Sequence, residues 1–131
     1  MSKKEGPRPA SYLTTADFAR LNHACLPVSE AFGGHVYLVG SALEREDYRD
    51  LDVRVILADD EFDSTFPNVR VWSLLCLGVT EYLQRVTGLP IDFQVQRMTE
   101  ANEKHHGSRN PVGTKARWFA GGGDATPSTF L

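Results

Sequence analysis

The pattern of apolar and polar residues predicts three strands and one long helix. The segment "HVYLVG" at 35–40 is apolar and bounded by glycines, which is typical of a buried strand. In "DLDVRVIL" at 50–57 and in "IDFQVQ" at 91–96 apolar and polar residues alternate, so each strand should have one apolar and one polar face. Between them, apolar residues recur every three or four positions after Asn68 and before Gly88, which predicts a helix. Its apolar stripe comprises Val69, Trp72, Cys76, Val79, Leu83 and Val86.

Shorter helices are expected on either side of these elements. Thr14 or Thr15 can cap a helix near the start of the chain, Pro27 interrupts that helix, and Gly33 ends it. This segment is therefore one kinked helix or two short ones. Near the other end, Thr99 can cap a short helix in "EANEKH".

The order of these elements predicts an α+β fold. We expect a small mixed sheet of three or four strands with the helices packed on one face. A chain of 131 residues with 41% apolar side chains has the size and core of one domain. The expected organisation is a flexible basic arm over 1–11, a single domain over 12–118 and a flexible Gly/Ser/Thr tail over 119–131.

Composition indicates a cytoplasmic protein with no membrane partner. The longest apolar stretches have four or five residues, far fewer than the ~18–20 of a membrane span, and no secretory signal follows the first residues. Cys25 and Cys76 are too few for a disulfide framework or a metal cluster. A net charge of −3 argues against a protein that wraps nucleic acid with its whole surface.

Charge is unevenly distributed along the chain. Between residues 41 and 66, nine acidic residues stand against three arginines, whereas between 97 and 117 five basic residues stand against two acids. An acidic centre can hold cations, and a basic segment folded beside it can hold phosphates. The alternative is a solvated acidic loop followed by an ordinary polar tail.

Three aspartates share the polar faces of two predicted strands. Asp50 and Asp52 point the same way, with their Cα atoms ~6–7 Å apart, and Asp92 lies on the polar face of the later strand. Carboxylates that close repel one another unless a cation lies between them. Three such oxygen donors suit Mg²⁺ or Mn²⁺. Solvated acids at the start of a strand are the simpler alternative for the pair.

The pair Gly40-Ser41 directly follows the first strand. Glycine lets the backbone approach a ligand, and the serine hydroxyl and free N–H groups can face an anion, so the position suits a phosphate. A strand exit followed by a helix cap explains the same two residues without a ligand.

Together these residues resemble the DNA polymerase β-type nucleotidyltransferase superfamily, specifically its small, minimal members. That family has a strand ending in Gly-Ser, a strand bearing Asp-x-Asp and a later strand bearing one further acid, and the likeness spans 35–96. The matching residues are Gly40, Ser41, Asp50, Asp52 and Asp92. The chain is also similar to short nucleotidyltransferase-like proteins of actinobacteria and their phages. It departs from the family in the turn "ALEREDYR", which is about two residues short, and in Arg54, where relatives carry an aliphatic residue.

The resemblance implies transfer of a nucleoside monophosphate from a nucleoside triphosphate to an acceptor. Asp50, Asp52 and Asp92 would hold two Mg²⁺ or Mn²⁺ ions, and Gly40 and Ser41 would cradle phosphates. The acceptor is an RNA, a protein or a small molecule. Because the chain has no room for the helical domain of larger members, a partner protein, a dimer mate or the acceptor itself would complete the site. The alternative is an inactive module that binds a nucleotide or a partner and retains the fold.

Four further residues have open roles. Arg54 either pairs with Asp52 and its neighbours or contacts the triphosphate or acceptor. Lys104 and Arg109, in "NEKHHGSRNP", offer donors for phosphates. The adjacent His105 and His106 are expected to be ordinary polar residues at the surface rather than metal ligands. Trp118, which "RWF" places near the chain end, is expected to be a docking anchor or an interface residue.

Overall fold

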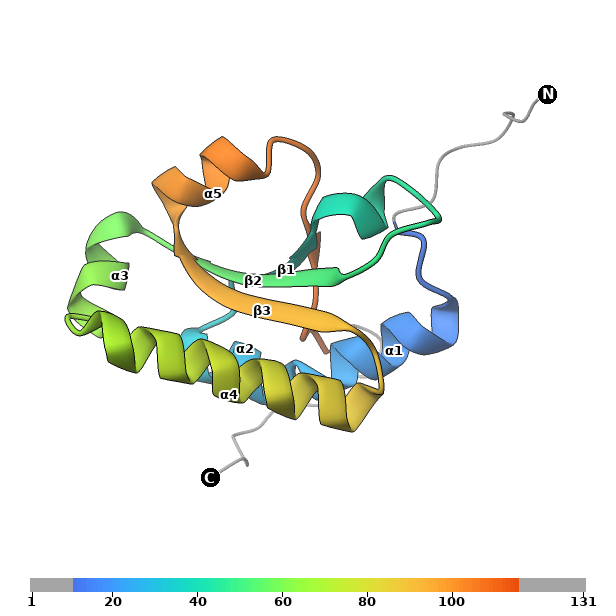
Figure 1. Ribbon diagram of the computed structural model, residues 1–131, viewed down its shortest axis with the longest axis horizontal. Coiled ribbons are helices and arrows are strands. Elements are labelled where there is room, and N and C mark those ends of the chain that lie inside the picture. Colours follow the sequence, from blue (N-terminus) through green and yellow to red (C-terminus); the bar gives the residue numbers. More distant parts are fainter. Residues whose placement is uncertain (1–10, 116–131) are drawn as a thin grey trace.

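The computed structural model describes residues 11–115, which form an α+β fold built on a four-stranded mixed sheet (Figure 1). Its strand order is β3-β2-β1-β4. The strands are β1 (Val36–Val39), β2 (Leu51–Leu57), β3 (Ile91–Arg97) and β4 (Asn110–Pro111). β1 runs antiparallel to β2 and β4, whereas β2 and β3 are parallel. The expected tail over 119–131, most of the expected arm over 1–11 and Trp118 lie outside the described residues.

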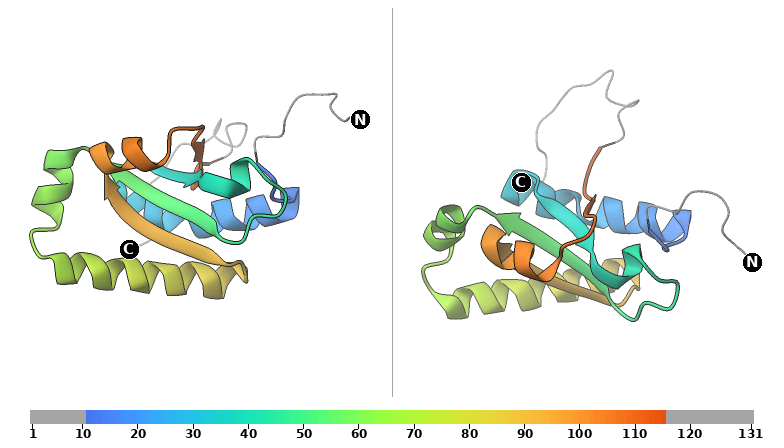
Figure 2. Two further views of the ribbon diagram at one scale, coloured as in Figure 1. Left: turned by 45° about the horizontal axis from the view of Figure 1, so that its top comes forward. Right: turned by 90° about the horizontal axis from the view of Figure 1, so that it is seen from above.

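Three helices cover one face of the sheet, as expected, and a short helix packs on the other (Figure 1, Figure 2). The first group is α1 (Thr15–Ala24), α2 (Leu26–Phe32) and α4 (Val69–Thr87). The helix α5 (Met98–Lys104) directly follows β3 and contacts both β2 and β3. Two further elements connect strands and helices, the 3-10 helix η1 (Gly40–Leu43) and the helix α3 (Asp59–Thr65).

The alternation in β2 and β3 produces one continuous apolar face. The parallel register pairs Leu51 with Ile91, Val53 with Phe93 and Val55 with Val95. All six side chains are at most 2% exposed. They belong to the single core that α1, α2 and α4 complete, so burial of this face fixes the register of the two strands.

The N-terminal segment forms two short helices rather than one kinked helix. The Thr14 hydroxyl oxygen accepts from the Asp17 N–H at 3.0 Å, so Thr14 is the cap. Pro27 lies in the first turn of α2, where its missing N–H costs no helical hydrogen bond, and Gly33, with φ 71°, closes that helix.

The long helix α4 begins and ends as predicted, but part of its expected stripe is exposed. Asn68 caps it by accepting from two backbone N–H groups, and Gly88 ends it with φ 74°. Cys76 and Leu83 are buried, whereas Val69 and Val86 are 68% and 50% exposed. Val69 lines an open hollow at the start of the helix. In the last turn Thr87 rather than Val86 faces the core.

Side chains of α4 also bond to the outer edge of β3. This edge is free of strand partners, because β3 is the terminal strand of the sheet. Four hydrogen bonds of 2.8–3.3 Å join the two elements. The helical side chains are Trp72, Thr80 and Gln84, and their main-chain partners are Val95, Phe93 and Ile91. The edge is therefore occupied by a helix instead of a fifth strand.

The connections contain one element that was not predicted and one cap that was predicted wrongly. The acidic segment contains α3, which the apolar pattern did not reveal. The last helix begins at Met98, and Thr99 does not cap it. Instead, the hydroxyl and the N–H of Thr99 both donate to the Asp59 carboxylate, which lowers the pKa of Asp59. Thr99 thus joins α5 to the start of α3.

Candidate functional site

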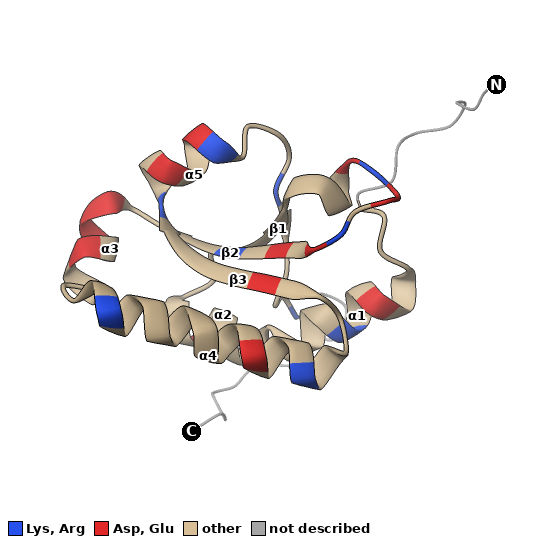
Figure 3. Ribbon diagram, viewed as in Figure 1, with Lys and Arg blue, Asp and Glu red and all other residues tan. Residues whose placement is uncertain are grey.

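Asp52 and Asp92 lie side by side on the polar face of the sheet. They are register partners on the parallel strands β2 and β3, so both side chains leave the sheet on the same face. Figure 3 shows the acidic segments of these strands adjacent to each other. The Asp52 side chain is 25% exposed and that of Asp92 is 50% exposed. Both carboxylates are thus accessible from one side of the molecule.

The buried side chain of Arg54 contacts both of these carboxylates. Its Nη2 lies 3.2 Å from Asp92 Oδ2 and 3.7 Å from Asp52 Oδ1. Its Nη1 donates to the carbonyl oxygens of Asp92 at 2.6 Å and of Val53 at 3.0 Å. Of the two roles open from the sequence, pairing with Asp52 and its neighbour is the one that the structure contains.

The polar face is less open than the alternation predicted. Arg54 is 6% exposed and Gln96, at the far end of β3, is 2% exposed. The helix α5 covers this part of the sheet and buries Ala101 against it. Of the polar-face side chains on β2 and β3, Asp52, Asp92 and Gln94 are therefore the ones that remain partly exposed.

Gly40 brings the backbone of η1 against Asp52. Its φ of 84° is in the left-handed region, and a Cβ placed on it would lie 2.5 Å from Asp52 Oδ2. Burial raises the pKa of Asp52; Arg54 acts in the opposite direction, and the charges of Asp92 and Asp50 raise the pKa further. A carboxylate in this position gains from an added cation.

Asp50 lies just before β2 and is exposed. It is near enough to influence the pKa of Asp52, but it makes no ion pair within the described residues. Over residues 11–115, no group of three or more His, Cys, Asp or Glu side chains is gathered tightly enough to hold a metal ion. Asp52 and Asp92 are therefore the two acids that the structure pairs, and Arg54 is the cation that both of them contact.

A hollow of about 340 Å³ lies beside Gly40 and Ser41. Its other wall is the segment that follows α5, with Lys104 among its residues. The complete lining is Gly40, Ser41, Glu44, Arg45, Lys104, His105, His106, Gly107 and Ser108. The fold thus brings together three of the residues expected to bind phosphate. Arg109 does not line the hollow, and its Nη2 donates to Asn102 Oδ1 at 2.8 Å.

His105, which was expected to be an ordinary polar surface residue, is half-buried and lines this hollow. Its Nε2 is buried and has no hydrogen-bond partner within the described residues. Burial lowers the pKa of His105, and the charges of Arg54, Arg109 and Lys104 lower it further. Burial and the neighbouring positive charges therefore both disfavour the protonated form of this imidazole. No periodicity in the sequence marks the burial of His105, because this burial depends on how the segment after α5 returns over the sheet.

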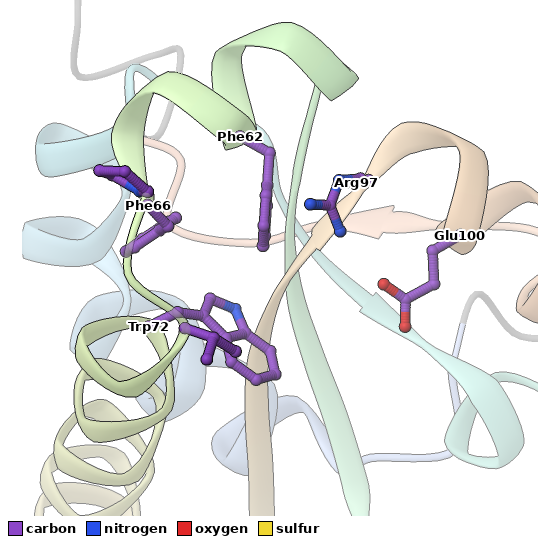
Figure 4. A pocket seen from close by; sticks show the side chains of 7 residues that line it. Phe62, Phe66, Trp72, Arg97 and Glu100 are labelled. Carbon is purple, nitrogen blue, oxygen red and sulfur yellow. The ribbon is translucent and has the colours of Figure 1, made fainter.

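A second hollow, of about 240 Å³, lies between α3 and the start of α4 (Figure 4). Arg97 stacks over the Phe62 ring, 4.4 Å from its centre, and also pairs with Asp63 at 2.7 Å. The Trp72 indole N–H donates to the Val95 carbonyl at 2.9 Å. Because Arg97 and the Trp72 indole already have protein partners, the residues around this hollow need no ligand to explain their arrangement.

Comparison with models of protein families, with curated proteins and with solved structures found no match to this chain. Among the described residues, no helix has the length and apolar character needed to cross a membrane.

Proposed function

We propose that this chain transfers a nucleoside monophosphate from a nucleoside triphosphate to an acceptor, as its likeness to the DNA polymerase β-type nucleotidyltransferases implies. The observation that supports this most strongly is the register pair Asp52 and Asp92, with the backbone of Gly40 packed against Asp52. Two carboxylates and a close glycine turn meet beside a hollow with basic residues. In the reaction, an acceptor hydroxyl attacks the α-phosphorus, its proton leaves, and the bond to pyrophosphate breaks.

Each residue has a role that its position supports. Gly40, Ser41 and Lys104 would bind the β- and γ-phosphates in the hollow that they line, and Arg109 would add positive charge beside it. Arg54 would orient the two carboxylates that it contacts.

The cation donors would be Asp50, Asp52 and Asp92. Two bound Mg²⁺ or Mn²⁺ ions would supply Lewis-acid activation and neutralise phosphate charge. Asp92, the more exposed of the two carboxylates that Arg54 contacts, would accept the proton of the acceptor. The acceptor is proposed to be an RNA, a protein or a small molecule.

One observation favours a second function, namely a catalytically inactive module that binds a nucleotide or a partner. Arg54 already supplies a positive charge to Asp52 and Asp92, and backbone carbonyls hold it there. A guanidinium fixed in this way can replace a metal ion structurally without activating a phosphate. In either case we propose a cytoplasmic location, because Cys25 and Cys76 are both free thiols.

The test uses the purified chain, each of the four α-labelled nucleoside triphosphates, Mg²⁺ and a host lysate as the source of acceptor. Transfer of label by the parent, its loss in Asp52→Asn and Asp92→Asn, and its retention in the exposed control Asp47→Asn support the transferase. Binding of a nucleotide without transfer supports the inactive module. Absence of both binding and transfer contradicts the proposal.

A further inference from the structure

The outer face of α4 is apolar and is not covered by any other described element (Figure 1, Figure 2). Leu74 is 69% exposed, Leu77 is 65% exposed and Val71 is 55% exposed. Large aliphatic side chains that gather on one exposed helix face are typical of interfaces rather than of free surfaces. The spacing of the two leucines places them on one side of the helix.

Charged residues continue the line of these leucines in both directions. Arg70 lies one turn before Leu74, and Glu81 lies one turn after Leu77. Positions 70, 74, 77 and 81 are spaced by four, three and four residues, which keeps them on one side of an α-helix. In Figure 3, α4 accordingly shows a basic band near its start and, after an uncharged stretch, an acidic band that is followed by a second basic band at the helix end.

This row of residues is complementary to itself. When two such helices lie antiparallel and are related by a two-fold axis midway between Leu75 and Cys76, Arg70 of one opposes Glu81 of the other. The same relation places Leu74 of each copy against Leu77 of its mate. The small residues Ser73 and Gly78 flank the row, so the two backbones can approach closely.

The outer edge of β3 is less suited to a second copy. The main chain along the outer edge of β3 already forms hydrogen bonds with side chains of α4.

The charged end of the row at Glu81 is available to a second copy. Within its own chain Glu81 pairs with Arg85, in an exposed pair at 3.3 Å. Such a pair is weak and leaves the carboxylate free to meet a second arginine.

We propose that two copies of this chain associate through the α4 ridge, the row Arg70, Leu74, Leu77 and Glu81, with the helices antiparallel. The dimer does not depend on nucleotide chemistry. Because α4 and the polar face with Asp52 and Asp92 lie on opposite sides of the sheet, the second chain leaves this polar face uncovered.

A charge-swap experiment tests both the association and its direction. Analytical ultracentrifugation of the full chain over a range of concentrations should show a monomer–dimer equilibrium. Arg70→Glu should oppose Glu81 of the mate and raise the dimer dissociation constant by about tenfold or more, and Glu81→Arg should do the same. The double variant Arg70→Glu with Glu81→Arg should restore the parent value.

Two controls complete the design. Glu103→Arg, an exposed charge reversal on α5, should leave the dimer unchanged, and Leu77→Gln should weaken it. Circular dichroism verifies that each variant is folded, which is expected since the changed side chains are exposed in the single chain. A parent that stays monomeric at its highest soluble concentration overturns the proposal. The proposal is also overturned if the single charge reversals leave the dimer dissociation constant unchanged. It is overturned as well if the double variant dissociates as readily as the single variants.

Discussion

Arg54 and Asp92 are joined at two points, through the backbone carbonyl and through the carboxylate of the aspartate. The two residues belong to neighbouring parallel strands, so these contacts link β2 to β3 beyond the ladder hydrogen bonds. Since Arg54 also faces Asp52, one buried guanidinium offsets the repulsion between two acids of the candidate site. This arrangement partly compensates the negative charge of the site without a bound ion.

Removing Arg54 should destabilise the fold strongly. Arg54→Met leaves two carbonyl oxygens without their donor and two carboxylates without their cation, so we expect the free energy of unfolding to fall by about 2–4 kcal/mol. Urea denaturation measures the change. Arg45→Met, which removes an exposed ion pair with Asp47, is the control and should change stability by less than about 1 kcal/mol. Equal stability of the Arg54 variant and the parent would contradict a structural role for the arginine.

Gly40 should not tolerate a side chain. Gly40→Ala places a methyl group against Asp52 Oδ2 and forces an L-residue to φ 84°, so a loss of about 1–3 kcal/mol is expected. Gly78→Ala is the matched control, because Gly78 is helical and an added Cβ meets nothing within 4 Å. This control should gain about 0.5–1 kcal/mol from helix propensity. Thermal melts at low protein concentration compare the two, and similar effects at both positions would refute the close approach of Gly40 to Asp52.

Asp52→Asn should separate fold stability from ligand binding. The folded pKa of Asp52 is raised, so ionised Asp52 opposes folding above its unfolded pKa, and this opposition disappears as the pH falls below that value. The variant should therefore be as stable as the parent, or more stable, at neutral pH in EDTA.

The same variant should lose stabilisation by Mg²⁺ and nucleotide. In the parent this stabilisation would grow to about 2.7 kcal/mol at a ligand concentration one hundred times Kd. Differential scanning fluorimetry with EDTA, then with Mg²⁺ and each nucleoside triphosphate, measures both effects. If the parent has one melting temperature in every buffer, no metal–nucleotide site operates here.

His105 should make stability depend on pH in the weakly acidic range. Its pKa is lowered in the folded state, so the unfolded chain binds a proton more readily and stability falls as the pH drops below the unfolded pKa of about 6.5. His105→Gln should flatten this decline, whereas the exposed neighbour His106 provides the control variant His106→Gln. Urea denaturation between pH 5 and pH 8, a range of about three units around that pKa, gives the comparison. An identical decline in the parent and in His105→Gln would show that the imidazole is not buried.

The strands and the long helix were predictable because their residues encode burial directly. Alternation in β2 and β3 reports which side chains face the core, and the caps Asn68 and Gly88 satisfy local backbone groups. The helix α3 was missed because only Phe62 within it is buried. Its three acids in the first turn were the available signal, since negative charge stabilises a helix start.

The site was only partly predictable for a related reason. The sequence places Asp52 and Asp92 on polar strand faces, and the parallel register then makes them neighbours. It does not reveal that α5 covers the same face further along, and so it missed the burial of Arg54 and of the His105 Nε2 atom. Both depend on how the chain returns after β3, which is set by tertiary packing rather than by a local pattern.

The hydrogen bonds from α4 to β3 also limit how this sheet can grow. An unpaired strand edge is a template on which another chain can add a strand, and repeated addition leads to aggregates. Here Trp72, Thr80 and Gln84 already occupy the main-chain groups that an incoming strand would need. An incoming strand would have to displace these side chains of α4 to pair with β3. The helix that completes the core thus also prevents further strands from adding to the β3 edge of the sheet.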